Sequence, residues 1–390
     1  MSNIPKLRFP EFTDAWEKCK LGEIATINPK STLPQTFNYV DLESVVGTEM
    51  RSYKIEKLYS APSRAQRLAK YGDIFYQTVR PYQKNNYLFE LDDENYVFST
   101  GYAQIRSKIY PYFLFTLIQN DRFVNEVLDN CTGTSYPAIN ATDLKNITIF
   151  ISNNPIEQQK IGNLFKQLDR LITLHKRKWD DVILLKRALL QKMFPKNGSD
   201  FPEIRFPEFT DAWEKCKLGE VAEFINGKAY KQEELLNEGK YKVVRVGNFN
   251  TNEHWYYSNL ELENNKYMVA GDLLYLWATD FGPKFWAGEK AIFHYHIWKL
   301  ELNYKIIDKN YLYVWLETDK EKIKQSTNGT TMVHVTKSTM EKRVLSFPTL
   351  PEQQKIGTLF RRLDRLITLH KRQHEHYQLL KKALLQQMFV

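Results

Sequence analysis

The sequence predicts an α+β protein in which two globular bodies are joined by two long helices that pair as an antiparallel coiled coil. Three observations carry this prediction: a leading segment of 16 residues occurs twice, a helix-forming segment occurs twice, and the stretches between them differ. The chain has 390 residues. Because that length exceeds what one ordinary hydrophobic core organises, at least two domains are expected.

Composition and charge exclude several classes of protein. Hydrophobic residues make up 43% of the chain, which is enough to bury sizeable cores. No stretch approaches the roughly 18 apolar residues of a membrane helix, and residues 1–12 lack the apolar run of a signal peptide. Cys19, Cys131 and Cys216 are odd in number and form no C-x-x-C pair, so neither a disulfide framework nor a cysteine zinc site is expected. A reducing cytoplasm fits this cysteine usage.

Two repeated segments form a frame. Residues 8–23 read RFPEFTDAWEKCKLGE, and residues 205–220 repeat them letter for letter. Self-similarity at a long, fixed spacing is the mark of a duplicated architecture. The second repeat consists of EQQKIG at 157–162 and 352–357, followed by LDRLITLHKR at 168–177 and 363–372.

The bodies inside this frame, roughly 24–154 and 221–349, do not match each other beyond faint echoes. Plain duplication followed by drift should erase the frame together with the bodies, so a frame with interchangeable bodies explains the pattern better. Each body mixes short β-like runs with helical segments and is expected to be an α+β globule. Strands are expected at 97–99, 103–105, 147–150, 241–246, 272–276 and 291–300, and helices at 110–128 and 310–324.

The repeated helical segments, 156–193 and 352–389, lack proline and are rich in good helix formers. Their apolar residues recur at the alternating spacing of three and four that is typical of a coiled-coil seam. His175 and His370 interrupt the two stripes at equivalent places and are expected to fix the register or to face a partner. The predicted pairing residues are Ile161, Leu164, Leu168, Leu171, Val182, Leu185, Leu189, Ile356, Leu359, Leu363, Leu366, Tyr377, Leu380 and Leu384.

Capping signals set the helix bounds. Asn154 and Thr349 stand three residues before Glu157 and Glu352, which is the spacing of a capping box. About 38 residues at ~1.5 Å each give a rod of roughly 57 Å. The alternative is that each helix only packs on its own body. The predicted domains are a first body at 1–155, a first long helix at 156–194, a linker with the second body at 195–350, and a second long helix at 351–390.

Motifs that would indicate catalysis are missing. The sequence contains neither a G-x-x-x-x-G-K-[ST] loop nor a G-x-G-x-x-G loop for phosphates. His294 and His296 lie on one face of a predicted strand, but two imidazoles without a third ligand make a poor metal site. His254 or His334 could supply a third ligand, which we consider improbable. We therefore expect no catalytic residue and no metal site in this chain.

The whole chain resembles the specificity (S) subunit of Type I restriction–modification systems. The resemblance is carried by the duplicated R-F-P-E-F-x-x-x-W-x-x-x-x-L-G-E at 8–23 and 205–220. It is also carried by P-x-E-Q-Q-K-I-G at 155–162 and by P-E-Q-Q-K-I-G at 351–357, where the proline is shifted by one residue. The bodies match only in general layout, as expected of target recognition domains whose sequences vary with the DNA they read.

The resemblance implies a set of partners and cofactors. Each body would read one half of a split, asymmetric site in double-stranded DNA, and the paired helices would set the gap between the halves. The helices would also dock two modification subunits, which methylate adenine with S-adenosylmethionine. Restriction subunits, which are motor nucleases, would join the complex and would use ATP and magnesium. This chain itself would bind no cofactor, act on no membrane and catalyse no reaction.

Polar, aromatic and basic residues cluster in both bodies and supply candidate DNA contacts. Arg and Lys suit guanine edges or phosphates, Gln and Asn suit adenine, and Thr can contact the thymine methyl group. Taken alone, any single cluster is more often a solvated loop than a DNA contact. The expected contacts are Arg64, Gln66, Arg67, Gln77, Thr78, Arg80, Lys84 and Tyr136 in the first body, and Lys228, Tyr230, Arg245, Asn248, Lys284, Thr331 and His334 in the second.

Two other classes of function remain open from the sequence. One is a self-contained DNA methyltransferase or nuclease with a degenerate motif, which would show activity without partner subunits. The other is a coiled-coil scaffold that does not act on DNA, which would retain no DNA sequence-specifically.

The net positive charge of the chain is carried by the two repeated helical segments. The chain carries a formal net charge of +9, which favours an anionic partner. Residues 156–193 hold nine basic and four acidic groups, and residues 352–389 hold eight and three. The bodies are therefore close to neutral and must rely on locally placed polar and basic groups, while the helices could face phosphates or acidic partner surfaces.

Overall fold

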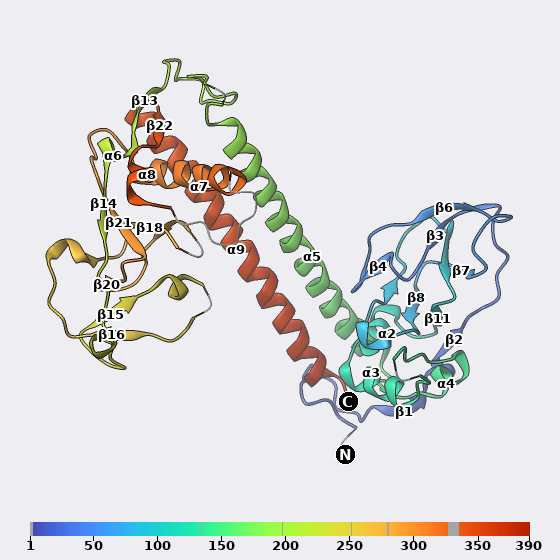
Figure 1. Cartoon of the computed structure of the whole chain (residues 1–390). Helices are drawn as coiled ribbons and strands as arrows, with labels where there is room; N and C mark the ends of the chain where they lie inside the picture. The colour runs from blue at the N-terminus through green and yellow to red at the C-terminus, as the bar shows by residue number, and fades with distance from the viewer. Residues whose placement is uncertain (1–2, 134, 197, 251, 279–280, 327–334) are drawn as a thin grey trace. The chain divides into compact units, whose positions relative to one another are not determined.

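The computed structural model describes residues 3–133, 135–196, 198–250, 252–278, 281–326 and 335–390 (Figure 1). The chain divides into two compact units: Met1–Arg177 with Lys371–Val390 form the first, and Lys178–His370 form the second. The long helices α5 (Pro155–Lys192) and α9 (Leu350–Met388) each contribute to both units. The α+β class and the two long helices are thus confirmed. Across the described ranges, no helix combines the length and apolarity needed to cross a membrane.

Two four-stranded sheets form the body of the first unit, in the orders β2-β11-β8-β9 and β6-β3-β10-β7. Within them β3 and β10 run parallel, and the other neighbours are antiparallel. The sheet strands are β2 (Ala25–Ile27), β3 (Thr36–Val40), β6 (Lys54–Lys57), β7 (Ala65–Leu68), β8 (Asp73–Gln77), β9 (Tyr87–Leu88), β10 (Tyr96–Ser99) and β11 (Tyr102–Ser107). The other elements are the pair β1 (Glu17–Lys20) and β12 (Thr148–Ile151), the hairpin β4 (Val45–Val46) and β5 (Glu49–Met50), and the helices α1 (Leu21–Ile24), α2 (Pro111–Leu117), α3 (Asp121–Asp129) and α4 (Ala141–Asn146).

The second unit is built in the same way, with sheets ordered β14-β21-β18-β19 and β16-β15-β20-β17. Its parallel pair is β15 and β20. The sheet strands are β14 (Ala222–Asn226), β15 (Tyr241–Val244), β16 (Tyr256–Ser258), β17 (Tyr267–Met268), β18 (Leu273–Leu276), β19 (Gly282–Phe285), β20 (Ala291–Phe293) and β21 (Ile297–Leu302). The other elements are the pair β13 (Glu214–Lys217) and β22 (Val344–Phe347) and the helices α6 (Leu218–Val221), α7 (Lys309–Ser326) and α8 (Lys337–Glu341).

The two bodies therefore share one topology, strand for strand, although their sequences do not match. The strands β2, β3, β6, β7, β8, β9, β10 and β11 correspond in chain order and in sheet position to β14, β15, β16, β17, β18, β19, β20 and β21. In the first unit the sheets face each other, because Phe75 of β8 stacks on Phe98 of β10 with ring centroids 3.6 Å apart. In the second unit Leu274 and Leu276 of β18 share a core cluster with Phe293 of β20. Loops that follow corresponding strands consequently occupy corresponding positions.

Two predicted elements are interrupted in the structure. The helix expected at 110–128 is two helices, because the chain turns after Leu117 and Asn120 caps α3 by accepting a hydrogen bond from the Arg122 N–H at 2.8 Å. The strand expected at 291–300 is also two elements, β20 and β21, separated by a turn at 294–296. The aromatic and β-branched composition of that stretch favours strand throughout, which conceals the turn.

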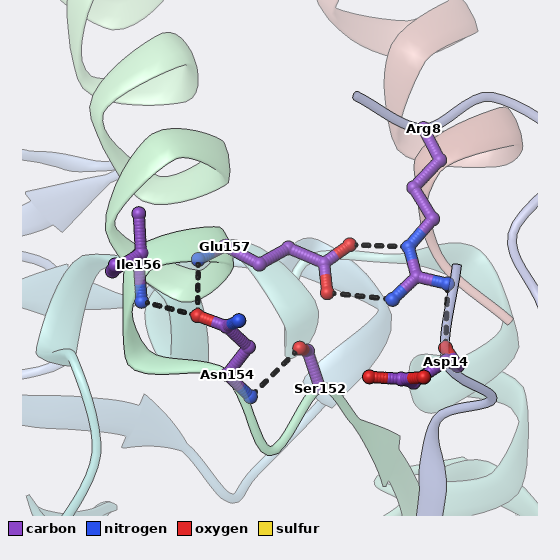
Figure 2. A network of polar contacts seen from close by, with 6 residues as sticks. All are labelled: Arg8, Asp14, Ser152, Asn154, Ile156 and Glu157. Atoms are coloured by element: carbon purple, nitrogen blue, oxygen red, sulfur yellow. Dashed lines mark hydrogen bonds and ion pairs between the residues drawn. The ribbon is translucent and has the colours of Figure 1, made fainter. Parts of the chain in front are cut away.

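The start of α5 differs in one respect from a capping box (Figure 2). The Asn154 side chain accepts hydrogen bonds from the N–H groups of Ile156 and Glu157, at 2.9 and 3.3 Å, as an N-cap should. The Glu157 carboxylate instead accepts two bonds from the Arg8 guanidinium, at 2.6 and 2.8 Å. The leading segment is thereby tied to the helix, and both side chains are buried. This bidentate pair raises the pKa of Arg8, chiefly through the hydrogen bond to Glu157.

The second repeat makes the same connection. Arg205 donates two hydrogen bonds to Glu352, both at 2.8 Å, where α9 begins. The Gln353 N–H donates to the Thr349 carbonyl at 3.0 Å. The glutamates of the two EQQKIG segments therefore bind arginines of the RFPEF segments, which explains why both segments recur together.

Within each unit the two long helices pack antiparallel. In the first unit Lys381 of α9 donates to Asp169 of α5 at 2.5 Å, and Tyr377 stacks on His175 with centroids 5.6 Å apart. The corresponding ion pair in the second unit joins Lys186 of α5 to Asp364 of α9. Partner numbers fall along α9 as they rise along α5, so the antiparallel pairing is confirmed within each unit.

The pairing seam is displaced by one residue at every second predicted position. Ile161, Leu168, Ile356 and Leu363 are buried as expected, but the following seam positions are Phe165 and Phe360, both fully buried. Adjacent apolar residues allow either choice, which is why the sequence pattern misplaces half of the seam. Leu164, Leu359, Val182, Leu189, Tyr377 and Leu384 pack at the core margins, Leu171 is half-buried, and Leu185, Leu366 and Leu380 are exposed.

Candidate nucleic-acid interface

Loops from both sheets meet at one edge of the first unit, which we call the first loop edge: residues 41–46, 78–86, 99–101 and 135–139. The Thr78 N–H donates to the Gly101 carbonyl at 3.0 Å, which joins the loop after β8 to the β10–β11 turn. The Arg80 N–H donates to the Pro137 carbonyl at 2.8 Å, which joins the fourth segment. This edge is hollowed by about 410 Å³, between Leu42, Glu43, Val45, Val46, Gln77, Val79, Arg80, Gln83, Asn85 and Tyr136.

Arg80 is the most distinctive side chain of this edge. Its backbone is left-handed, with φ 55° and ψ 57°, a conformation that costs a non-glycine residue roughly 1–3 kcal/mol and that clusters at functional sites. Its guanidinium lies over the ring of Tyr136, 4.4 Å from the centroid, and that tyrosine is 64% exposed. Within the described residues, Arg80 forms no ion pair with a carboxylate. An arginine held over a tyrosine ring at a hollow edge, without a carboxylate partner among the described residues, can donate to a base edge or a phosphate.

Other predicted contacts of the first body support the loop itself. The buried Gln77 amide donates to the Val79 carbonyl at 2.7 Å and to Gln83 Oε1 at 2.9 Å. The Thr78 hydroxyl donates to the Gly101 carbonyl at 2.8 Å. Lys84 pairs with Asp121 and donates to the Gln119 carbonyl. These three side chains shape the edge by bonds within the protein.

The remaining predicted residues of the first body lie on or beside β7. Arg64 is exposed, and its carbonyl accepts from the Thr100 N–H at 2.8 Å, which places it beside the first loop edge. Gln66 is exposed and donates to the Ser63 carbonyl at 2.8 Å. Arg67 is half-buried on β7, where burial lowers its pKa.

The second loop edge comprises residues 227–231, 245–250, 277–278 and 294–296. The last three of these segments follow β15, β18 and β20, which correspond to β3, β8 and β10 of the first unit. The His294 N–H donates to the Val244 carbonyl at 2.9 Å, and the Trp277 N–H donates to the His296 carbonyl at 3.2 Å. These bonds join the ends of β15, β18 and β20. The Trp277 bond has its counterpart in the bond from the Thr78 N–H to the Gly101 carbonyl in the first unit. Gly227 approaches so closely that a Cβ there would lie 2.3 Å from the Phe293 carbonyl oxygen, so this position requires glycine.

The structure places the predicted residues of the second body as follows. Arg245 lies over the Tyr256 ring at 4.6 Å. The Asn248 side chain accepts from the Arg245 N–H and donates to the His254 carbonyl, both at 3.0 Å, so it holds the loop. Lys228 pairs with Glu234 at 2.9 Å. Tyr230 is half-buried with a raised pKa caused chiefly by burial, Lys284 lies on β19 opposite Leu274, and Thr331 and His334 fall outside the described residues.

Sequence reasoning missed the turn at 294–296 as part of this edge. A strand through this stretch would place Tyr295 on the face opposite His294 and His296. The turn instead gathers all three rings within 4.0 to 4.8 Å of one another. Burial, then His296 and Arg245, lower the pKa of His294 to about 4, so it is neutral at pH 7. Within the described ranges, no three His, Cys, Asp or Glu side chains are grouped to hold a metal ion.

Comparison with known proteins gives one consistent family. The model of the Type I restriction modification DNA specificity domain matches residues 13–185 and 210–376, one match for each repeat. The Type I restriction enzyme MjaVIII specificity subunit of Methanocaldococcus jannaschii is 28% identical over 204 residues, which cover 52% of this chain and 47% of that protein. The putative type I restriction enzyme MjaX specificity subunit of the same organism is 24% identical over 292 residues, covering 72% of this chain and 67% of the relative.

The first of these matches spans about half the length of the curated relative. A solved structure extends the likeness to the whole chain at the level of the fold. The crystal structure of the S subunit of a Type-I restriction-modification system from M. genitalium superposes with a TM-score of 0.67, covering 99% of both chains at 16% identity.

Proposed function

The chain belongs to the family of the Type I restriction modification DNA specificity domain, and from this premise we propose that it is the subunit through which a Type I restriction–modification complex recognises DNA. Each unit reads one half of a bipartite, asymmetric site through its loop edge. The observation that carries the proposal is the combination of one shared topology with two chemically different loop edges. In the first unit this scaffold presents Arg80 and Tyr136. In the second unit it presents Arg245, together with the histidine and tyrosine side chains of the turn at 294–296.

The proposal assigns the spacing of the two half-sites to the long helices. Readers that contact one face of a duplex need centres about one helical turn, ~34 Å, apart. Two helices of roughly 57 Å that pair antiparallel in each unit can hold such a spacing. An ion pair between an aspartate and a lysine joins α5 to α9 in both units. It is formed by Asp169 and Lys381 in the first unit and by Asp364 and Lys186 in the second. The helices therefore set the gap between the half-sites.

The partners follow from the duplicated surface. Two equal helices offer two equal docking places, which suits two modification subunits. Those subunits bind S-adenosylmethionine and methylate adenine, and restriction subunits add the ATP- and magnesium-dependent steps. This chain binds no cofactor of its own and catalyses no step, and it acts in the cytoplasm, where DNA is the substrate.

Body exchange tests the proposal. Residues 24–154 are replaced by the body of another chain of this family, and the methylated adenines are mapped across a genome with the modification subunits present. One half of the site changes, while the other half and the gap stay. A change in both halves, or in neither, contradicts the proposal.

A further inference from the structure

We propose that the turn at 294–296, between β20 and β21, is the specificity-determining element of the second unit, and that it contacts the major-groove edge of a purine in that unit's half-site. This inference rests on the proposed function and adds the residues and the base class. Tyr295, at the centre of the turn, is 38% exposed. His294 and His296 flank it on either side.

The turn lies at the same place in the fold as a turn of the first unit. Corresponding strands place it at the second loop edge, where the β10–β11 turn lies in the first unit. In the first unit this turn consists of Thr100 and Gly101, without a ring. The second unit thus carries three ring side chains where the first carries none. A difference confined to a corresponding loop is what two readers of different half-sites require.

The turn is held rigidly. The Trp277 Nε1–H donates to the Tyr295 carbonyl at 2.7 Å, and the Tyr295 N–H donates to the Lys228 carbonyl at 3.1 Å. The Lys228 N–H donates to the Phe293 carbonyl at 3.0 Å, beside the close approach of Gly227. Bonds on both sides fix the backbone before any ligand arrives, and a preorganised contact costs less ordering entropy on binding.

The chemistry of the turn suits a base edge. His296 lies 4.8 Å from Trp277 and 4.0 Å from Tyr295, and His294 lies 4.4 Å from Tyr295, as ring centroids. A neutral imidazole carries one donor and one acceptor nitrogen. Guanine presents two acceptors in the major groove, and adenine presents an acceptor and a donor. His294 Nδ1 accepts from the His296 N–H at 3.5 Å, so the Nε2–H of His294 remains to donate to a purine acceptor, and the His296 imidazole supplies a second polar group beside it. Because His294 is neutral at pH 7, its ring donates without a general attraction for phosphate.

Arg245 completes the set. It lies over Tyr256 at 4.6 Å, at the end of β15, and its charge contributes to the lowered pKa of His294. The corresponding position after β3 in the first unit is Asp41, an acid that pairs with Lys54. The two edges therefore differ in charge as well as in ring content.

The test uses the full chain assembled with its modification subunits. Tyr295→Ala and the double variant His294→Ala with His296→Ala are compared with the control Tyr304→Ala, whose ring is 64% exposed in the loop after β21. Methylated adenines are mapped for each. We expect the two turn variants to lose discrimination, roughly tenfold to a hundredfold, at one or two base pairs of one half-site. The other half-site, the gap and the control map stay as in the wild type.

An unchanged map, or an equal loss of methylation at every sequence, overturns the inference. If an alanine variant fails to assemble with the modification subunits, His294→Gln with His296→Gln keeps polar side chains of similar size and is expected to give the same relaxation. A wild-type complex that methylates without sequence preference would instead remove the proposed function, so the two failures are distinguishable.

Discussion

The ring of Phe389 packs edge-on against Trp16, with centroids 5.8 Å apart and an interplanar angle of 78°. Phe194 and Trp213 repeat this contact at 5.9 Å and 86°. Each tryptophan comes from a leading segment, and each phenylalanine comes at the end of the helical segment of the other repeat. Backbone bonds accompany them: the Leu7 N–H donates to the Gln387 carbonyl, and the Ile204 N–H donates to the Lys192 carbonyl, both at 2.9 Å. Each unit is completed by the helix of the other repeat.

Phe389→Ala should destabilise the first unit by about 3–5 kcal/mol, because it removes a buried aromatic ring from a close-packed core. Phe194→Ala should do the same to the second unit. Hydrogen–deuterium exchange, followed separately for the two units, measures the effect. Leu379→Ala, at a 67% exposed helix position, is the control. Unchanged protection of the first unit in Phe389→Ala would show that the ring does not complete its core.

Glu157→Gln should destabilise the first unit by roughly 1.5–3 kcal/mol, because the buried Arg8 loses a charged hydrogen-bond partner. Glu352→Gln should have an equal effect in the second unit, where Arg205 is the partner. Chemical unfolding measures both. Glu11→Gln is the control. It removes the exposed ion-pair partner of Lys160, which lies on α5 like Glu157, and should change the free energy of unfolding little. Equal effects of Glu157→Gln and Glu11→Gln would contradict the assigned role of the buried pair.

Gly357→Ala should destabilise the second unit although alanine favours helices. A Cβ at this position would lie 2.7 Å from the Asn310 Cβ and 2.9 Å from the Tyr311 backbone nitrogen. Overpacking of this kind costs typically 1–3 kcal/mol, against a gain of about 1 kcal/mol in helix propensity. Thermal unfolding compares it with Thr358→Ala at the exposed neighbouring position. A Gly357→Ala chain as stable as the wild type would mean that α9 can move away from α7.

Arg80→Ala should relax one base pair of the half-site read by the first unit, at a cost of ~1–3 kcal/mol. Its stack on Tyr136 holds the guanidinium at the hollow of the first loop edge. Mapping of methylated adenines measures the change. Lys70→Ala is the matched control. Lys70 is an exposed basic residue that precedes the start of β8, whereas Arg80 follows its end. A uniform loss at all sequences would identify Arg80 as a phosphate contact.

The frame could be predicted from the sequence because its segments occur twice in the chain. The repeated segments contain the residues that bind one another, such as Arg8 with Glu157, and the long helices have a strong periodicity. The seam was misplaced at half of its positions because pairs such as Leu164 and Phe165 are both apolar. Phe165 takes the buried seam position because of side-chain packing, which cannot be read from the spacing of apolar residues.

The candidate site was less predictable. Polar residues such as Gln77 and Lys84 have the composition of DNA contacts, but their partners lie within the protein. Which groups a side chain meets depends on contacts between distant segments. Conversely, the turn at 294–296 has the composition of a strand. It is a turn because β20 and β21 belong to different sheets, which the sequence does not reveal.

The central claim is that each unit reads its own half-site on an equivalent frame. The most direct measurement is a map of methylated adenines for a chain that carries residues 24–154 in both frames, assembled with the modification subunits. We expect a symmetric site in which the first half-site occurs twice as an inverted repeat. A site that retains the original second half, or an assembled complex without sequence preference, would contradict it.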